Sequence, residues 1–283
     1  MKTGLVLEGG GMRGLYTAGI IDVLLENDIK FDAVVGVSAG TTFGCNYKSK
    51  QIGRTIRYNR KVCKDYRYGS LKSWLKTGDV FEKEFCYEYI PKVMDPFDYD
   101  TFEKNPVEFY ATCTDVLTGE PVYKQCLKGD DTEIEWFRAS ASMPLVSNIV
   151  EIDGGKYLDG GVADSIPIRW MRNKGYEKNM VVLTRHDGYR KGPNRLLWLM
   201  KISLRKYPKM VNAIKYRHIN YNESLDELKR LKEEGSVLLF YPEKNLKISR
   251  MENNPDKLQE AYDMGRKHAS ERLEEIKAFV GKN

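Results

Sequence analysis

Apolar runs and helical patterns alternate along the first part of the chain. Residues 3–7 (TGLVL) and 31–37 are continuous apolar, β-rich runs, which is the pattern of buried strands. Residues 15–27 instead repeat apolar side chains at helical spacing, and a further helix can begin at Thr41. This order of strand, helix, strand and helix predicts a parallel sheet with helices on its faces.

The remaining sequence continues the same pattern. Further strands are expected at 107–112, 180–184 and 237–241, and a hairpin over 149–158. Helices are expected at 133–141, at 167–173 and, as one long helix, at about 255–279. We therefore predict a single α/β domain over residues 1–283, with its core at about 1–185 and irregular basic insertions at about 47–100 and 185–235.

Composition limits the class of protein. Hydrophobic residues make up 41% and charged residues 30% of the 283 residues, which is typical of a globular chain. No stretch approaches the ~20 apolar residues of a membrane-spanning helix, and the N-terminus lacks the pattern of a signal peptide. We expect a cytoplasmic protein, with peripheral contact at a membrane compatible with that location.

The cysteines and histidines give no sign of a metal site or a disulfide framework. The five cysteines are an odd number without C-x-x-C spacing, and the three histidines lie far apart in the sequence. Reduced thiols in a cytosolic protein are the expectation.

Two basic segments stand out from an acidic remainder. Residues 47–76 and 185–218 each hold ten Lys or Arg and one acid, although the whole chain has a net charge of only +6. Such segments suit an anionic partner, either a lipid surface or a nucleic acid, but a solvated face is the plainer interpretation. Within the second segment, the apolar and basic stretch 195–207 suits either a helix on an anionic membrane or a helix packed in the core.

Residues 36–40 (GVSAG) match the G-x-S-x-G pattern directly after a predicted strand. A nucleophilic serine must project from a tight turn between strand and helix, where flanking glycines avoid side-chain clashes. We interpret Ser38 as the nucleophile, with Gly36 and Gly40 as the glycines of its elbow; a purely structural turn is the alternative.

A glycine-rich loop, residues 9–14 (GGGMRG), follows the first predicted strand. Consecutive glycines leave backbone N–H groups open to an anion, which in an acyl hydrolase is the oxyanion of the tetrahedral intermediate. The loop also fits the dinucleotide fingerprint G-x-G-x-x-G, but Asp32 precedes the next strand instead of ending it, which is wrong for a ribose contact. The candidate residues of this loop are Gly9, Gly10, Gly11, Arg13 and Gly14.

A base for Ser38 has two candidates. Asp159 follows the predicted hairpin strand, and Gly160 and Gly161 after it permit close approach of a neighbouring backbone. His186, which follows the strand at 180–184, would instead complete a Ser–Asp–His triad.

Taken together, these blocks resemble the patatin-like phospholipase family. The glycine loop, the serine elbow and the Asp159-Gly160-Gly161 turn occur in the family's order, and residues 139–144 (ASASMP) are similar to its Ala/Ser-rich segment before a proline. The resemblance covers roughly residues 1–185.

The resemblance implies a three-layer α/β/α fold with a mainly parallel sheet and hydrolysis of acyl esters in lipids. It implies a Ser38–Asp159 dyad without a catalytic histidine, an oxyanion hole in the glycine loop and no cofactor. Because the unperturbed pKa of aspartate is about 3.9, such a base needs a raised pKa, or the oxyanion hole supplies more of the catalysis.

Two further interpretations stay open. The same dyad would serve acyl transfer or the cleavage of thioesters and small esters. A catalytically weak scaffold that binds an anionic surface or a nucleic acid is the alternative from another class, although no nucleic-acid motif is present and no nucleic acid is expected as a partner.

Overall fold

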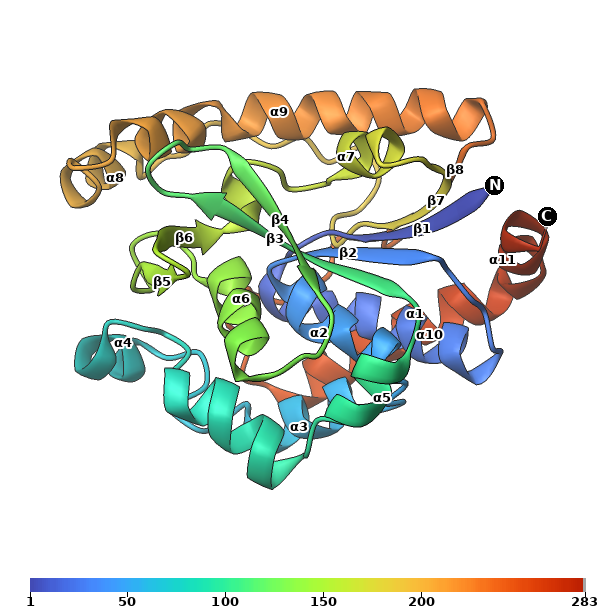
Figure 1. The fold of residues 1–283 in the computed structure, drawn as a ribbon, viewed down its shortest axis with the longest axis horizontal. Helices are drawn as coiled ribbons and strands as arrows, with labels where there is room; N and C mark the ends of the chain where they lie inside the picture. Colours follow the sequence, from blue (N-terminus) through green and yellow to red (C-terminus); the bar gives the residue numbers. More distant parts are fainter. Residues whose placement is uncertain (282–283) are drawn as a thin grey trace.

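A mixed eight-stranded sheet lies between two layers of helices in the computed structural model, which describes residues 1–281 (Figure 1). The strand order is β5-β6-β3-β2-β1-β7-β8, and β4 pairs with β3. The strands are β1 (Lys2–Leu7), β2 (Ala33–Val37), β3 (Glu108–Asp115), β4 (Pro121–Cys126), β5 (Val150–Ile152), β6 (Gly155–Asp159), β7 (Tyr176–Val182) and β8 (Val237–Phe240).

The sheet has a parallel part and an antiparallel part that meet at β3. Strands β8, β7, β1, β2 and β3 are parallel neighbours, as short apolar runs separated by helices predict. Strands β4 and β6 pair with β3 in the antiparallel sense, and β5 continues from β6. The three-layer α/β/α prediction is confirmed, but the sheet is mixed because the hairpin and β4 fold back onto β3.

Helices cover both faces of the sheet. In Figure 1, α7 and α9 lie above the strands, and α1, α2 and α10 lie below them. The helices are α1 (Leu15–Glu26), α2 (Ala39–Lys48), α3 (Arg54–Val62), α4 (Leu71–Thr77), a π-helix (Glu84–Met94), α5 (Tyr99–Lys104), α6 (Asp131–Ala141), α7 (Ile168–Asn173), α8 (Leu197–Ser203), α9 (Pro208–Glu233), α10 (Pro255–Glu271) and α11 (Leu273–Val280).

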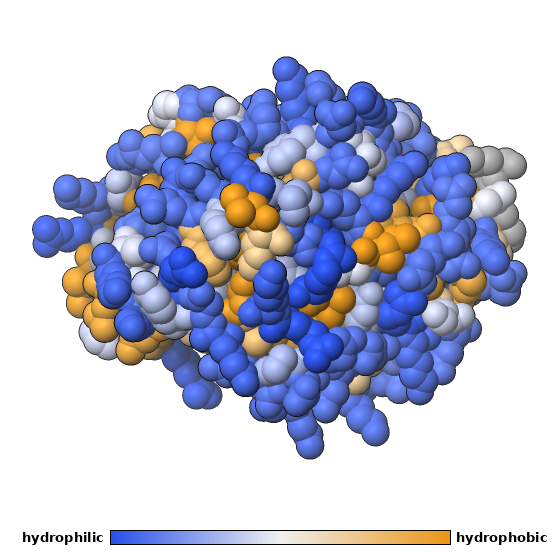
Figure 2. Space-filling model, turned by 90° about the horizontal axis from the view of Figure 1, so that it is seen from below, coloured by the Kyte–Doolittle hydropathy of each residue, from blue (hydrophilic) through white to orange (hydrophobic). Residues whose placement is uncertain are grey.

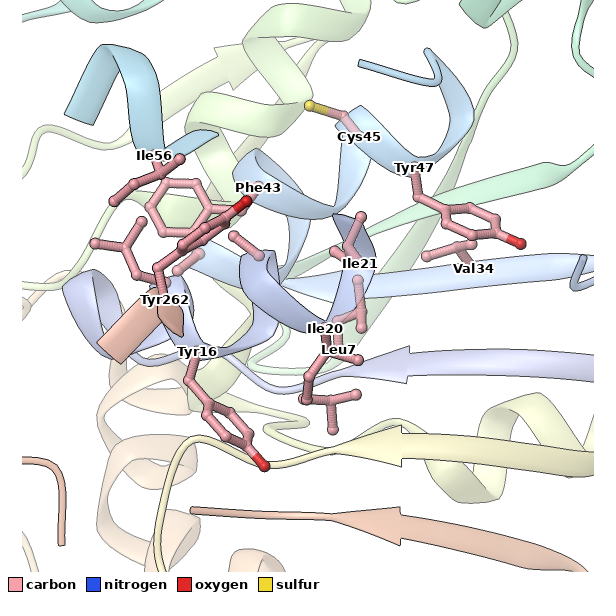
Figure 3. Packing of buried hydrophobic residues seen from close by; sticks show 14 of the residues in the cluster. Leu7, Tyr16, Ile20, Ile21, Val34, Phe43, Cys45, Tyr47, Ile56 and Tyr262 are labelled. Atoms are coloured by element: carbon pink, nitrogen blue, oxygen red, sulfur yellow. The ribbon is translucent and has the colours of Figure 1, made fainter. Parts of the chain in front are cut away.

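Alternate side chains of the strands pack into hydrophobic cores on opposite faces of the sheet. On β1, Leu5 and Leu7 join the larger core below the sheet, and Val6 joins the core beneath α7 and α9. Figure 3 shows Leu7 beside Ile20 of α1 in the larger core. The three side chains that Figure 3 shows together on the other side of α1 are Phe43 of α2, Ile56 of α3 and Tyr262 of α10.

Helix α1 is buried along most of its length because α10 covers the side that the sheet leaves open. The two helices approach closely at Gly19 and Gly265, where a Cβ atom on either glycine would meet the backbone of the other helix. The Tyr16 hydroxyl and Nδ1 of His268 are 3.0 Å apart across the same contact. Helix α10 thus holds α1 against the sheet.

Several predicted elements differ from those in the structure. The C-terminal segment forms two helices, because the backbone of Arg272 (φ −109°, ψ 19°) leaves the helical range. The basic segments are mostly helical, and α9, whose first residue is Pro208, runs for 26 residues. The single domain over 1–283 stays a prediction, which the pairing of β8 with β7 supports.

None of the helices within residues 1–281 combines the length and the hydrophobicity that crossing a bilayer requires.

Candidate active site

Ser38 lies at a sharp turn between β2 and α2. Its backbone has φ 55° and ψ −119°, a conformation that costs a non-glycine residue about 1–3 kcal/mol and occurs mainly at functional sites. The turn is held by the Ser38 carbonyl, which accepts hydrogen bonds from the amides of Thr41 (2.9 Å) and Thr42 (3.1 Å). Gly36 and Gly40 face each other across it with no room for a Cβ atom on Gly36. The strain therefore presents the serine at the carboxyl edge of the parallel strands.

The register of β3 explains why Asp159 lies near Ser38. Val37, the last residue of β2, pairs with Thr112 of β3. The next position of β3, Cys113, pairs with Asp159 at the end of β6. Because β4 occupies the other edge of β3 along this stretch, β6 takes over the edge that β2 leaves. The serine and the aspartate thus follow two strands that meet end to end on one neighbour.

Residues of the Ala/Ser-rich segment fix the backbone on both sides of this junction. The Ser140 hydroxyl accepts a hydrogen bond from the Ser38 amide (3.0 Å) and donates one to the Thr112 carbonyl (2.7 Å). The Ser142 carbonyl accepts a hydrogen bond from the Asp159 amide (2.8 Å). The sequence pattern marked this segment, but its role in joining the two turns is visible only in three dimensions.

The Asp159 carboxyl is almost fully buried, with 6% of the residue exposed. Burial raises its pKa above the usual value; the charge of Arg217, the nearby Ser38 hydroxyl and the Gly161 amide (2.8 Å) act in the opposite direction. Gly160 packs against the Thr112 carbonyl, and Gly161 lies between the Asp159 and Arg217 side chains. The environment is thus that of a carboxylate whose affinity for a proton is increased.

The glycine loop runs from the end of β1 past Ser38. A Cβ atom on Gly9 would lie 2.8 Å from Cβ of Ser38, and Gly14 packs against Ala39, the residue after the serine. Gly11 has φ 58°, and the amide of Met12 donates to the Arg250 carbonyl (3.1 Å). Within residues 1–281 the amides of Gly10 and Gly11 have no hydrogen-bond acceptor. Unpaired amides beside a serine suit an anion that forms there.

Arg13 of this loop is buried, and 6% of it is exposed. Burial, together with the charges of Arg185 and Arg250, lowers its pKa to about 10. Its Nε atom has no hydrogen-bond partner in the described part of the chain. Arg13 therefore contributes positive charge close to the loop.

Two cavities meet at Ser38. The first, of about 110 Å³, is largely apolar. The second, of about 310 Å³, contains most of the charged groups of the site. Gly11, Ser38 and Met143 line both. The π-helix, a rare structure found often at functional sites, supplies Cys86, Tyr87, Ile90 and Pro91 to the apolar cavity. A serine between an apolar and a charged space can attack an ester that joins an apolar chain to a polar group.

The two alternatives from the sequence find no support in this geometry. His186 lines neither cavity at Ser38, and its Nδ1 atom lies 2.6 Å from the Asp187 carbonyl. Asp32 accepts a hydrogen bond from the Thr3 amide (2.6 Å), at the opposite end of β1 from the glycine loop. An aspartate at that end is too far from the glycines to hold the ribose of a nucleotide bound there.

Four residues of the second cavity escaped the sequence analysis as site residues. They are Arg185, Lys191, Arg217 and Arg250. Three of them belong to the basic segment 185–218, for which the sequence predicted an anionic partner or a solvated face instead of a place beside Ser38.

Two family models match separate parts of this chain. A family model described as patatin-like phospholipase matches residues 5–170, and one described as a domain of unknown function (DUF6363) matches 207–281. Uncharacterized protein YjjU of Escherichia coli K12 is 26% identical over 278 residues, which is 94% of this chain and 75% of that protein.

Two further relatives match over a smaller share of their own length. Lysophospholipase nte1 of Aspergillus fumigatus is 29% identical over 61% of this chain and 11% of that protein. Uncharacterized NTE family protein Rv1063c of Mycobacterium tuberculosis is 24% identical over 69% of this chain and 51% of that protein. The matched part of this chain therefore spans about a tenth of the Aspergillus protein and about half of the Mycobacterium protein.

Proposed function

Because this chain belongs to the patatin-like phospholipase family, a family of lipid acyl hydrolases, we propose that it cleaves carboxylic esters of lipids with a Ser38–Asp159 dyad. One observation carries the proposal: a strained serine and a buried aspartate follow two strands that meet on β3. Burial raises the pKa of the aspartate, which is the direction of shift that favours a carboxylate as a base.

The proposed reaction has two steps. Asp159 takes the proton of the Ser38 hydroxyl while the Ser38 oxygen bonds to the ester carbonyl carbon. The amides of the glycine loop then hold the oxyanion that forms. The bond to the alcohol then breaks, and the alcohol leaves with the proton from Asp159. Water then loses a proton to the same carboxylate and bonds to the acyl carbon; the bond to Ser38 breaks, the fatty acid leaves, and the proton passes from Asp159 back to the Ser38 oxygen.

The two cavities suggest how a lipid ester would lie. The acyl chain enters the apolar cavity beside Phe43 and Phe137, and the alcohol lies in the charged cavity. Incubation with a fluorophosphonate followed by intact-mass measurement tests the proposal, because an activated serine gives one covalent adduct. A folded protein that gives no adduct, even with detergent or anionic lipid present, would favour the binding-scaffold alternative.

The oxyanion hole gives a first prediction, the effect of Gly11→Ala. At φ 58° an alanine is strained, and its Cβ would lie 2.5 Å from the Arg250 carbonyl, so the loop must shift. Loss of one oxyanion donor slows acyl transfer about 10²–10³-fold, and we expect fluorophosphonate labelling to slow by at least about tenfold. Gly192→Ala is the matched control, since no atom lies within 4 Å of its added Cβ. Equal labelling rates for the parent and both variants would contradict this role of the loop.

Exposed apolar side chains of two helices lie at one end of the molecule and are called the apolar rim here. Leu71 and Leu75 of α4 and Trp198 and Ile202 of α8 are exposed, and the two helices share a surface groove. Figure 2 shows a hydrophobic patch at the end of the molecule where α4 and α8 lie in Figure 1. We propose that this rim contacts the lipid surface from which the acyl chain is drawn.

The basic segments contribute unequally to that contact. In residues 47–76, Arg54 is buried, and Arg57 is paired with Asp95 (2.7 Å). These cations stabilise the helical layer below the sheet. Helix α4, at the end of the same segment, instead exposes Lys72 and Lys76 beside its apolar side chains. In residues 185–218, α8 likewise places apolar side chains beside the exposed Lys201. The proposed membrane contact is therefore assigned to α4 and α8.

Replacing both Leu75 and Trp198 by serine tests the rim. Each large apolar side chain contributes about 1.5–3 kcal/mol when buried, so we expect vesicle binding to fall at least about tenfold in co-sedimentation. Ile219→Ser, which changes an exposed residue of α9, is the control and should bind as the parent does. Equal binding of the parent to neutral and anionic vesicles would remove the electrostatic part of the contact, and unchanged binding of the double variant would refute the rim.

A further inference from the structure

The second cavity collects positive charge from distant parts of the chain. Its five cationic residues, here the cationic cluster, are Arg13, Arg185, Lys191, Arg217 and Arg250. Only Arg13 lies within residues 5–170, which the patatin-like model matches, and two of the five lie within residues 207–281. The segment that resembles a domain of unknown function thus supplies charge to the space beside the proposed nucleophile.

The positive charge of the cluster is only partly neutralised by the two acidic residues of the cavity. Of the ion pairs formed in residues 1–281, none includes a member of the cationic cluster. Glu8 and Asp159 are the acidic residues of the cavity. Glu8 accepts hydrogen bonds from the Thr184 amide (2.6 Å) and the Tyr221 hydroxyl (2.8 Å), so its oxygens are already engaged.

The members of the cluster repel one another. Burial and the charges of Arg217, Arg250 and Arg185 lower the pKa of Lys191 to about 7. Nε of Arg13 and Nε of Arg217 are buried without a hydrogen-bond partner in the described chain. Charges held together at such a cost, with unused donors, are typical of a site completed by a bound anion.

We propose that the cationic cluster binds a phosphate group on the alcohol half of the substrate and selects anionic over zwitterionic or neutral lipid esters. The proposal rests on the proposed hydrolase function. With the acyl chain in the apolar cavity, the leaving alcohol points into the second cavity, where the cluster lies. Phosphate oxygens match the arginine donors, whereas a choline group would meet a field of its own sign.

Kinetics with three substrates of the same short acyl chain test the proposal. They are an acylglycerol phosphate, an acylglycerophosphocholine and an acylglycerol, all supplied below the concentration at which they aggregate. We expect kcat/KM of the parent to be at least about tenfold higher for the acylglycerol phosphate than for the other two. In the double variant R185Q/K191Q this preference should fall at least about tenfold.

Arg195→Gln is the matched control, because Arg195 is an exposed arginine of the same segment that lines neither cavity at Ser38. It should keep the preference of the parent. Thermal unfolding checks the fold of every variant, and fluorophosphonate labelling of Ser38 is measured on the same samples. Absent labelling would count against the hydrolase function, whereas normal labelling without a preference would overturn the phosphate subsite alone.

Inorganic phosphate distinguishes a lipid phosphate from a free one. At matched ionic strength, phosphate should compete with the acylglycerol phosphate more strongly in the parent than in R185Q/K191Q. If phosphate inhibits but the parent hydrolyses phosphorylated and neutral esters equally, the cluster takes a free anion and selectivity for the lipid headgroup is refuted. An unchanged preference in R185Q/K191Q would also refute it.

Discussion

Ser38→Ala is expected to abolish both ester hydrolysis and fluorophosphonate labelling while leaving the fold intact. Loss of a nucleophile removes the covalent route, and turnover should fall at least about 10³-fold. The alanine keeps the same backbone strain at φ 55° and the Ser140 hydrogen bond to the amide, so Tm should change by no more than about 3 °C. Intact-mass and hydrolysis measurements on the parent and the variant give the result.

Ser270→Ala serves as the control, because Ser270 is an exposed serine of α10 that lines neither cavity at Ser38. It should label and turn over as the parent does. An adduct of equal yield on Ser38→Ala would place the reactive group elsewhere and refute the proposed nucleophile.

Asp159→Asn is expected to lower kcat by about 10²–10⁴-fold, the usual contribution of a general base. The amide keeps the shape of the carboxyl and can accept the Gly161 hydrogen bond, but it takes no proton. In the parent, kcat/KM should fall as acid protonates Asp159, at a pH above the ~3.9 of an ordinary aspartate because burial raises its pKa. Hydrolysis measured across pH should lose this acid limb in the variant.

The raised pKa of Asp159 also affects the stability of the fold as the pH changes. A folded-state pKa above the unfolded value means that the folded state binds the proton more tightly, so stability from this group is fully present below pH ~3.9 and is lost as the pH rises through the folded pKa. Asp159→Asn should therefore unfold at an equal or higher temperature than the parent at pH 7. A clearly lower Tm at pH 7, or a variant with full activity, would contradict the buried-base assignment.

The sequence predicts local features of the site well because each depends on neighbouring residues. A serine between glycines after an apolar run defines the Ser38 turn, and the Asp159 turn follows its hairpin strand in the same way. The position of one beside the other depends on the shared edge of β3, which local patterns do not encode.

The position of the cationic cluster beside Ser38 could not be predicted from the sequence for a related reason. Arg217 and Arg250 lie more than 170 residues from Ser38 along the chain, and their spacing in the sequence follows no motif. The apolar stripe of residues 255–279 likewise continues through Arg272, so periodicity alone extends one helix where the backbone forms two. Strand β4, with mixed polar and partly buried residues, lacks the apolar run by which the other strands were recognised.

The closure of α10 over α1 has a consequence for how the protein is made. Strand β1 gains its second neighbour only after about 170 more residues, when β7 emerges, and α1 gains its cover still later. At about 5–20 residues per second, synthesis of that interval takes roughly 10–35 s. During this time the nascent chain exposes a strand edge and an apolar helix, which are sites for chaperones or for aggregation. Strand β1 and helix α1 thus complete their packing only after β7 and α10 have been synthesised.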